Sequence, residues 1–198
     1  MADKYVFLDR DGVINRDGSE ITEHGYIIHW EDFEFLPGVI DAMVKLYQQG
    51  FKCVIISNQQ CVGKNICSEE DINELSRHIS EEIKSSGGEI TKFYYCFHRE
   101  EDDCGCRKPA PGLFEQAKKG LGIEDITGFF YVGDTERDVQ AGRAAGVKTI
   151  LVLSGNTKKG EAENWSHKPE HVCENLLEAV DVIIGENRRQ KEPRALSF

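Results

Sequence analysis

The sequence predicts an α/β fold in which a central parallel sheet is covered by helices on both faces. Short runs of β-branched and aromatic residues alternate with stretches of helical periodicity along almost the whole chain. The strand-like runs are apolar throughout, which is typical of strands buried on both faces of a parallel sheet. With 198 residues, the chain is long enough for one domain with a substantial core.

The first strand is expected over residues 5–8 and ends at Asp9. A helix is then expected over residues 37–50. A Pro-Gly pair opens it, apolar residues recur inside it at helical spacing, and Gly50 closes it.

The next strand covers residues 51–56 and ends at Ser57. A long helix begins after Ser68, because Ser68 and Asp71 resemble a capping pair and an apolar stripe follows them.

The second half continues the alternation up to a polar tail. Strands are expected at 93–97, 129–132 and 149–153, helices at 111–119, 138–145 and 176–184, one domain over 1–185, and the tail over 186–198.

Composition excludes several functions. The chain has 35 acidic and 24 basic residues, and its net charge of −11 repels nucleic acid and anionic membranes. The longest apolar run, residues 93–97, is far shorter than the roughly 20 residues of a membrane helix. The N-terminus does not resemble a signal peptide. We therefore expect a cytoplasmic monomer with no nucleic-acid or membrane partner, although a local cluster of donors and a metal still permits a small anionic ligand.

Polar residues follow the ends of four predicted strands. They are Asp9, Ser57, His98 and Asp134. Because ligands bind at the carboxyl ends of parallel strands, the fold is expected to bring these residues to one edge of the sheet.

Asp9 and Asp11 form the sharpest local feature. Residues i and i+2 of an extended segment point to the same side, so both carboxylates are expected to face one pocket. With Asp134 nearby, their mutual repulsion favours a hard divalent cation, most naturally Mg²⁺. One carboxylate could then attack phosphorus while the other exchanges a proton with the leaving oxygen. Alone, the pair is also compatible with a solvated acidic turn.

Two further segments suit an anionic group. Ser57 and Asn58 place a hydroxyl, an amide and free backbone N–H groups at a strand end, although an ordinary strand-to-loop junction has the same composition. Arg107 and Lys108 place two cations before a helix, and a surface charge pair is the alternative.

Asp134 and Asp138 follow the strand at 129–132. They could support a metal from its inner and outer sides, or they could simply cap a helix N-terminus.

A second strong signal is a cluster of metal-ligand residues. Three cysteines and one histidine occur as two pairs five residues apart, at Cys96, His98, Cys104 and Cys106. Three thiolates and an imidazole make a closed tetrahedral site typical of structural zinc, whereas the alternative is a coincidence of cytosolic thiols. Such a site would brace the two cations that follow it.

Four motifs occur in order with appropriate spacing: FLDRDG at 7–12, SNQ at 57–59, RKP at 107–109 and GDTERD at 133–138. Together they resemble the haloacid dehalogenase (HAD) superfamily of phosphohydrolases. Within it the chain is most similar to the D-glycero-D-manno-heptose 1,7-bisphosphate phosphatase group and its histidinol-phosphate phosphatase relatives. The resemblance covers residues 5–155, including HGY at 24–26.

The resemblance implies a role for each matching residue. Asp9 would be the nucleophile that forms an aspartyl-phosphate, and Asp11 the general acid and base. The substrate would be bound by Ser57, Asn58, Gln59, Arg107, Lys108, His24, Gly25 and Tyr26. Mg²⁺ would be bound by Asp9, the Asp11 backbone carbonyl and Asp134, supported by Asp138 and Thr135, and Zn²⁺ by Cys96, His98, Cys104 and Cys106.

The implied activity is Mg²⁺-dependent hydrolysis of a small phosphorylated metabolite, with the 7-phosphate of the heptose bisphosphate as the first expectation and histidinol phosphate as the alternative. No segment is long enough for a separate cap domain, so loops 16–30, 60–67 and 99–107 are expected to shape an open site.

The sequence departs from this family pattern at three places: an insertion at 16–23, the loop at 60–64, and Thr135 where the heptose group often has lysine. Two other classes of function fit the sequence less well. A nucleotide-sugar glycosyltransferase explains neither Lys108 nor Ser57, and a non-catalytic phosphometabolite-binding protein is not supported by any missing catalytic position.

Overall fold

The computed structural model describes residues 3–191, and within them six parallel strands form one sheet in the order β3-β2-β1-β4-β5-β6. The strands are β1 (Lys4–Leu8), β2 (Phe51–Asn58), β3 (Ile90–Cys96), β4 (Phe130–Gly133), β5 (Lys148–Val152) and β6 (His171–Cys173). The helices are α1 (Val39–Gln48), α2 (Glu69–Ser85), α3 (Gly112–Leu121), α4 (Glu136–Ala145) and α5 (Leu176–Lys191). Short 3₁₀ turns are η1 (Gly18–Glu20), η2 (Trp30–Asp32), η3 (Glu100–Asp102) and η4 (Glu161–Asn164).

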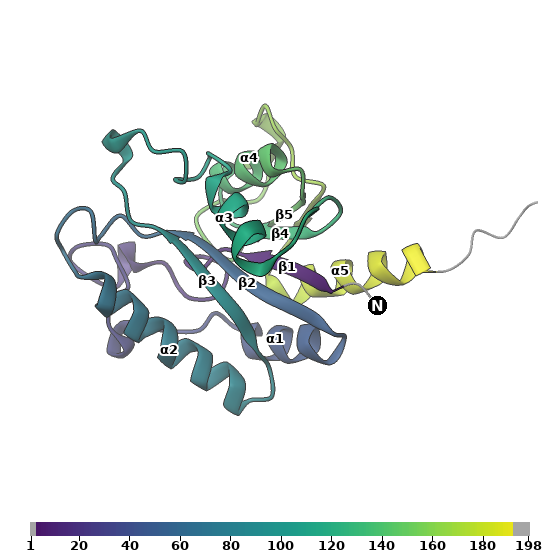
Figure 1. Cartoon of the computed structure of the whole chain (residues 1–198), viewed down its shortest axis with the longest axis horizontal. Coiled ribbons are helices and arrows are strands. Elements are labelled where there is room, and N and C mark those ends of the chain that lie inside the picture. The colour runs from purple at the N-terminus through teal and green to yellow at the C-terminus, as the bar shows by residue number, and fades with distance from the viewer. Residues whose placement is uncertain (1–2, 192–198) are drawn as a thin grey trace, which may run out of the picture.

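The sheet is the middle of three layers (Figure 1). Side chains of β1 alternate between its two faces, as a period of two requires. Val6 and Leu8 pack in a core with α1, α2 and α5, whereas Phe7 packs with α3 on the opposite face. Its ring meets the Phe114 ring edge-on, with 5.4 Å between the ring centroids. Both faces of the sheet are therefore buried in apolar cores. The predicted fold class is confirmed.

The order of the strands reverses next to β1. From β1 the chain builds outward through β2 to β3, and it returns to place β4 on the other side of β1, followed by β5 and β6. The loops that leave the carboxyl ends of β1 and β4 therefore diverge, which opens a crevice at that edge of the sheet. This is where the fold positions a ligand site.

The structure differs from the predicted elements at the C-terminal end. Strand β6 was not predicted, because three residues with one exposed member give no apolar run. The predicted start of the tail at residue 186 is wrong, since α5 continues to Lys191 and Glu186 forms ion pairs with Lys148 and His171. Residues 192–198 of the predicted tail lie outside the described residues.

Strand β3 begins at Ile90, three residues before the predicted start at 93. The prediction missed these residues because they include polar, exposed side chains that give no apolar run. Among the described helices, none has the length and apolar character needed to cross a membrane.

Candidate active site

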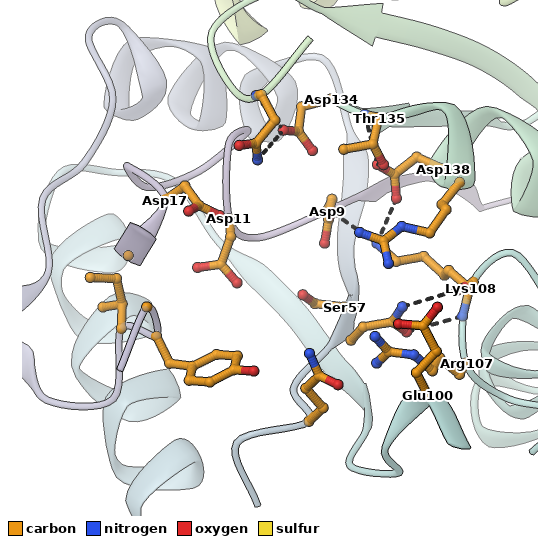
Figure 2. Close-up of a pocket in the computed structure, with 18 of the residues that line it drawn as sticks. Asp9, Asp11, Asp17, Ser57, Glu100, Arg107, Lys108, Asp134, Thr135 and Asp138 are labelled. Carbon is orange, nitrogen blue, oxygen red and sulfur yellow. Dashed lines mark hydrogen bonds and ion pairs between the residues drawn. The ribbon is translucent and has the colours of Figure 1, made fainter. Parts of the chain in front are cut away.

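A pocket of about 510 Å³ opens at the carboxyl edge of the sheet. Its floor carries the acidic residues and the lysine that the sequence singled out (Figure 2). Residues of the three predicted loops, 16–30, 60–67 and 99–107, line its walls, and residues that follow β4 and β5 also contribute. The pocket is lined by Asp9, Asp11, Asp17, Gly18, His24, Gly25, Tyr26, Ile27, Ser57, Asn58, Gln60, Glu100, Arg107, Lys108, Asp134, Thr135, Arg137, Asp138 and Asn156.

Asp9 lies where the chain leaves β1. Its backbone N–H donates to the carbonyl of Val132 on β4 (2.9 Å), which ties the turn to the neighbouring strand. One carboxylate oxygen accepts from the backbone N–H of Arg10 (2.8 Å), and the other lies 2.8 Å from Lys108 Nζ. Burial raises the pKa of Asp9 to about 6, against the opposing effect of the lysine.

Lys108 lies under the pocket with its ammonium group fully engaged. Besides Asp9, Lys108 Nζ contacts Asp138 Oδ1 (2.7 Å), the Tyr131 hydroxyl (2.8 Å) and the Ile56 carbonyl (3.2 Å). Burial alone would lower the pKa of Lys108, but the two carboxylates outweigh it and raise the pKa above its ordinary value. The floor of the pocket therefore holds a permanent positive charge beside Asp9.

Asn58 fixes the backbone of Lys108. Its side-chain oxygen accepts from the Lys108 N–H (3.0 Å), and its amide group donates to the Lys108 carbonyl (3.1 Å). The side-chain amide predicted to contact phosphate is thus occupied in positioning the lysine, at the end of a strand that itself borders the pocket.

Asp138 joins Lys108 to the first turn of α4. One oxygen contacts Lys108 and the Tyr131 hydroxyl (2.8 Å), and the other accepts from the backbone N–H (3.0 Å) and hydroxyl (2.6 Å) of Thr135. Asp138 and Thr135 form the reciprocal capping box of α4. Burial acts to raise the pKa of Asp138, but Lys108 and these hydrogen bonds lower it below its ordinary range.

Asp11 faces the same pocket but has different neighbours. Its Oδ1 accepts from Arg10 Nε (3.2 Å) and Nη2 (3.0 Å) and from Asn15 Nδ2 (2.9 Å), and its Oδ2 accepts from Gln59 Nε2 (2.7 Å). Burial would raise the pKa of Asp11, but Arg10 and the hydrogen bonds lower it. Gln59 also donates to Ser57 Oγ (3.2 Å). It is buried behind the pocket wall and positions these two groups.

Asp134 completes the floor from the end of β4. Its Oδ2 accepts from the backbone N–H (2.8 Å) and side-chain amide (3.2 Å) of Asn156. A Cβ on Gly12 or Gly155 would lie 2.4 or 2.2 Å from this oxygen, so only glycine fits at either position. Burial, followed by repulsion from Asp138 and Asp9, raises the pKa of Asp134 to about 8.

The carboxylates of Asp9, Asp134 and Asp138 approach one another closely enough to share a cation, with ligand oxygens within 4.8 Å. Asp138 already uses both oxygens on Lys108, Tyr131 and Thr135, so Asp9 and Asp134 are the available pair. Burial raises the pKa of both carboxylates, so a cation nearby would favour their ionised forms. Buried, oxygen-only donors of this kind fit a hard divalent cation such as Mg²⁺.

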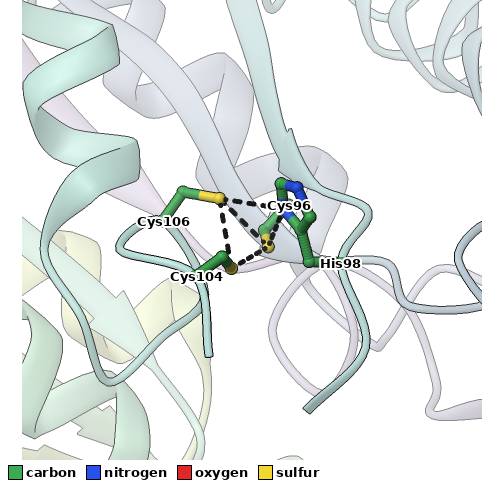
Figure 3. A group of neighbouring side chains, drawn as sticks. All are labelled: Cys96, His98, Cys104 and Cys106. Atoms are coloured by element: carbon green, nitrogen blue, oxygen red, sulfur yellow. Dashed lines mark hydrogen bonds between the residues drawn. The ribbon is translucent and has the colours of Figure 1, made fainter. Parts of the chain in front are cut away.

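A second group of ligand atoms lies at the end of β3, beside the pocket wall (Figure 3). Cys106 Sγ lies 3.3 Å from Cys96 Sγ, 3.5 Å from Cys104 Sγ and 3.3 Å from His98 Nδ1. Four donors at 2.0–2.3 Å from one ion would be separated by about 3.5 Å, so the group is arranged around one point. The structure thus brings together all four residues that the sequence predicted.

The predicted contacts at the mouth also line the pocket. Lys64 Nζ donates to the Tyr26 hydroxyl (3.0 Å), which joins loop 60–67 to loop 16–30. The His24 ring stacks on the Tyr26 ring, with centroids 6.2 Å apart. Arg107 borders the pocket from the cysteine-rich loop, and its buried Nη1 atom has no hydrogen-bond partner among the described residues.

Sequence reasoning missed three residues that complete these networks. Asn156 follows β5 at the same edge of the sheet, so the rule that located Asp134 would have found it. Arg10 stands between the two motif aspartates and holds Asp11. The Tyr131 hydroxyl is buried between Lys108 and Asp138, and a tyrosine inside an apolar strand gives no signal of this role.

Comparison with known proteins places this site in a family. Residues 105–179 match the HAD-hydrolase-like family. D-glycero-beta-D-manno-heptose-1,7-bisphosphate 7-phosphatase from Neisseria meningitidis serogroup A is 34% identical over 93% of this chain and 96% of its own. The protein of the same name from Vibrio cholerae is 40% identical over 82% of this chain and 89% of its own.

A solved structure agrees. The D,D-heptose 1,7-bisphosphate phosphatase from B. bronchiseptica, complexed with magnesium and phosphate, superposes with a TM-score of 0.83 at 29% identity, covering 92% of this chain and 99% of the other. The chain therefore belongs to the HAD-like hydrolases, and the resemblance based on its four motifs is confirmed. Within that family it is a phosphatase, an enzyme that hydrolyses phosphoric monoesters.

Proposed function

We propose that this phosphatase removes the 7-phosphate of D-glycero-β-D-manno-heptose 1,7-bisphosphate, in a Mg²⁺-dependent reaction that passes through an aspartyl-phosphate on Asp9. The observation that carries the mechanism is the floor of the pocket, where Asp9 lies 2.8 Å from the ammonium group of Lys108. The named activity of relatives at 34–40% identity supports the choice of substrate.

Asp9, Asp134 and the backbone carbonyl of Asp11 would hold the metal. A Mg²⁺ ion bound there would neutralise the negative charge of these carboxylates and of the phosphoryl oxygens. Gly12 and Gly155 keep the space around Asp134 clear, which a metal ligand in so crowded a turn requires.

The nucleophile is a carboxylate oxygen of Asp9. It attacks phosphorus, the bond between phosphorus and the sugar oxygen breaks, and that oxygen takes a proton from Asp11. Asp11 then accepts a proton from the water that attacks the aspartyl-phosphate, which releases inorganic phosphate and restores Asp9. Arg10, Asn15 and Gln59 hold Asp11 ionised in the free site. A bound phosphate dianion beside it raises its pKa, which prepares the acid form for the first step.

Phosphoryl transfer requires mainly positioning and charge neutralisation. Lys108 supplies a positive charge beside Asp9, and Asn58 fixes its backbone. The Ser57 hydroxyl, oriented by Gln59, borders the pocket and suits a phosphoryl oxygen. His24, Gly25 and Tyr26 border the pocket from loop 16–30, where the sugar would extend.

The cysteine-rich loop would hold one structural zinc ion through Cys96, His98, Cys104 and Cys106. The loop leads directly into Arg107 and Lys108, so the ion would restrain the two cations of the site. Four protein ligands would leave no open position on the ion for substrate or water, so its role would be structural. We further propose that the protein is a cytoplasmic monomer without nucleic-acid or membrane partners. The net charge of −11 supports the absence of such partners, because it repels nucleic acid and anionic membranes.

Histidinol phosphate is the second candidate, because acidic groups at the mouth, such as Asp17, would suit its cationic amine. A glycosyltransferase is not supported, since it would give no role to the ion pair between Lys108 and Asp9. The named relatives are phosphatases.

The test is kcat/KM for the heptose bisphosphate, fructose 1,6-bisphosphate and histidinol phosphate, with and without Mg²⁺ in buffer cleared of divalent ions by a resin. A soluble chelator is avoided because it would also remove zinc. We expect the heptose bisphosphate to be the best substrate and its hydrolysis to require Mg²⁺. A preference of about tenfold or more for histidinol phosphate would overturn the substrate assignment, and full activity without Mg²⁺ would overturn the mechanism.

A further inference from the structure

Two arginines that line the pocket have no partner among residues 3–191. The side chains of Arg107 and Arg137 make no hydrogen bond or ion pair with any described residue, although both line the pocket. In a chain with 35 acidic and 24 basic residues, other arginines are paired, such as Arg77 with Glu70 and Arg143 with Glu170. Both unpaired guanidinium groups therefore remain available to an anionic ligand.

Local stability does not explain Arg137. It occupies the first turn of α4, between Glu136 and Asp138. The partial positive charge at a helix N-terminus favours acidic residues and disfavours a cation there, typically by about 0.3–1 kcal/mol. Helix α2 follows this preference with three consecutive acidic residues in its first turn. Arg137 places a cation where the helix N-terminus disfavours one, and its side chain is exposed and has no partner among the described residues. This combination indicates a role in the pocket.

The ion pair on the floor brings the chain segments that carry the two arginines close together. Lys108 Nζ and Asp138 Oδ1 are 2.7 Å apart, and Arg107 and Arg137 are the residues immediately before each of them. Lys108 and Asp138 turn inward and are buried, whereas Arg137 is exposed and Arg107 half-buried at the pocket. A transferred phosphoryl beside Asp9 would thus have the segments that carry both arginines on the Lys108 side of the pocket.

Neither acidic residue of the walls neutralises this pair. Asp17 accepts from the backbone N–H of Ser19 at the start of η1. Glu100, on η3, is exposed and forms no ion pair with Arg107. In addition, the buried Nη1 atom of Arg107 has no hydrogen-bond partner within the described part of the chain, which costs free energy until an acceptor reaches it.

We propose that Arg137 is a specificity-determining residue that binds, together with Arg107, the second phosphate of a sugar bisphosphate. The inference rests on the proposed function, since the first phosphate must be at Asp9. Two planar guanidinium groups can each donate parallel hydrogen bonds to phosphate oxygens, and an anion with several acceptor oxygens is the ligand that both geometries favour.

The test compares two substrates with the same reacting phosphate, heptose 1,7-bisphosphate and heptose 7-phosphate, in wild type, Arg137→Ala, Arg137→Lys and Arg137→Glu. The quantity measured is the ratio of their kcat/KM values. We expect Arg137→Ala to lower this ratio at least about tenfold, Arg137→Lys to restore part of it, and Arg137→Glu to lower it further. Arg143→Ala, on the same helix but outside the pocket, is the matched control and keeps the wild-type ratio.

An equal loss for both substrates in Arg137→Ala, or a ratio that Arg137→Glu leaves at the wild-type value, would overturn the inference while the phosphatase assignment stands. Failure of the proposed function gives a different result: wild type would release phosphate from neither heptose substrate, and the inference would fall with it.

Discussion

Lys108 lies between two carboxylates, 2.8 Å from Asp9 and 2.7 Å from Asp138. The two acids are not equivalent, because Asp138 accepts further hydrogen bonds from Thr135 and Tyr131 and its pKa is lowered, whereas the pKa of Asp9 is raised to about 6. Asp138 therefore serves as the permanent counter-charge of the lysine. Asp9 is free to change its bonding without leaving a buried ammonium group unpaired.

Removal of the Asn58 side chain tests how the lysine is positioned. Asn58→Ala deletes the two hydrogen bonds to the Lys108 backbone. We expect kcat to fall by about 10–100-fold with a smaller change in KM, because a small misplacement of a charged group weakens transition-state stabilisation most. Steady-state kinetics measures the split. An unchanged kcat would show that Lys108 is held without Asn58.

For single residues, the sequence predicted which residues belong to the site better than it predicted what their side chains contact. Asp9, Asp11, Lys108 and Asp134 were predicted and all line one pocket. For Asn58 and Gln59 the motif predicted contact with substrate, yet their amides are occupied by protein groups. The direction of a side chain at a strand end depends on neighbouring strands, and no local pattern encodes it.

Among the elements, the cysteine-rich loop shows how a segment without regular structure can be fixed. It runs from the end of β3 to the start of α3, and the N–H of Gly112 donates to the Gly105 carbonyl (3.1 Å). A Cβ on Gly112 would lie 2.3 Å from that oxygen, so the loop packs directly against the helix start. The converging donors of Cys96, His98, Cys104 and Cys106 supply the remaining restraint.

Loss of one ligand tests this restraint. Cys104→Ser is expected to release the metal, lower the melting temperature and reduce kcat, because Arg107 and Lys108 follow the loop directly. Elemental analysis should find one zinc per chain in wild type and none in the variant. Cys67→Ser, at a half-buried cysteine outside the cluster, is the control and keeps its zinc. A wild-type protein purified without zinc, with ordinary stability and activity, would contradict the site.

The long elements could be predicted because their apolar patterns are continuous, and β1, β2 and α2 have strong end signals. The short strand β6 and the last turns of α5 could not. His171–Cys173 pairs with β5 only through tertiary contact. The end of α5 is polar by sequence, and Glu186 there contacts the sheet edge through Lys148 and His171.

For the whole molecule, that contact predicts a pH dependence of stability. Lys148 and His171 outweigh the effect of burial and lower the pKa of Glu186 from 4.5. The interaction therefore stabilises the fold fully at pH values above the pKa of Glu186 in the unfolded chain. This stabilisation is lost as the pH falls through the lower pKa of Glu186 in the folded protein. We expect Glu186→Gln to reduce the unfolding free energy by about 1 kcal/mol near pH 7.

Urea unfolding at several pH values measures the difference between wild type and Glu186→Gln. The difference should persist from neutral pH down to about 5 and shrink below about 4.5. A difference of constant size down to pH ~3.5 would contradict the assignment of the effect to this carboxylate.

The overall topology explains why residues far apart in sequence meet at the pocket. Asp9, Ser57 and Asp134 lie at the carboxyl ends of adjacent strands β1, β2 and β4, where the strand order reverses. Burial and repulsion from neighbouring carboxylates raise the pKa values of Asp9 and Asp134. The carboxylates that the fold buries together thus favour cations beside them, such as the ammonium group of Lys108 and a bound metal ion.

The central claim is that Asp9 becomes covalently phosphorylated, and the most direct measurement is acid quenching of wild type within one turnover of labelled heptose bisphosphate. We predict labelled protein, with the label on the peptide that contains Asp9, and neither label nor phosphate release above roughly a thousandth of the wild-type rate in a folded Asp9→Asn variant. Phosphate release at the wild-type rate by Asp9→Asn, or turnover of wild type with no labelled protein at any time, would contradict the account.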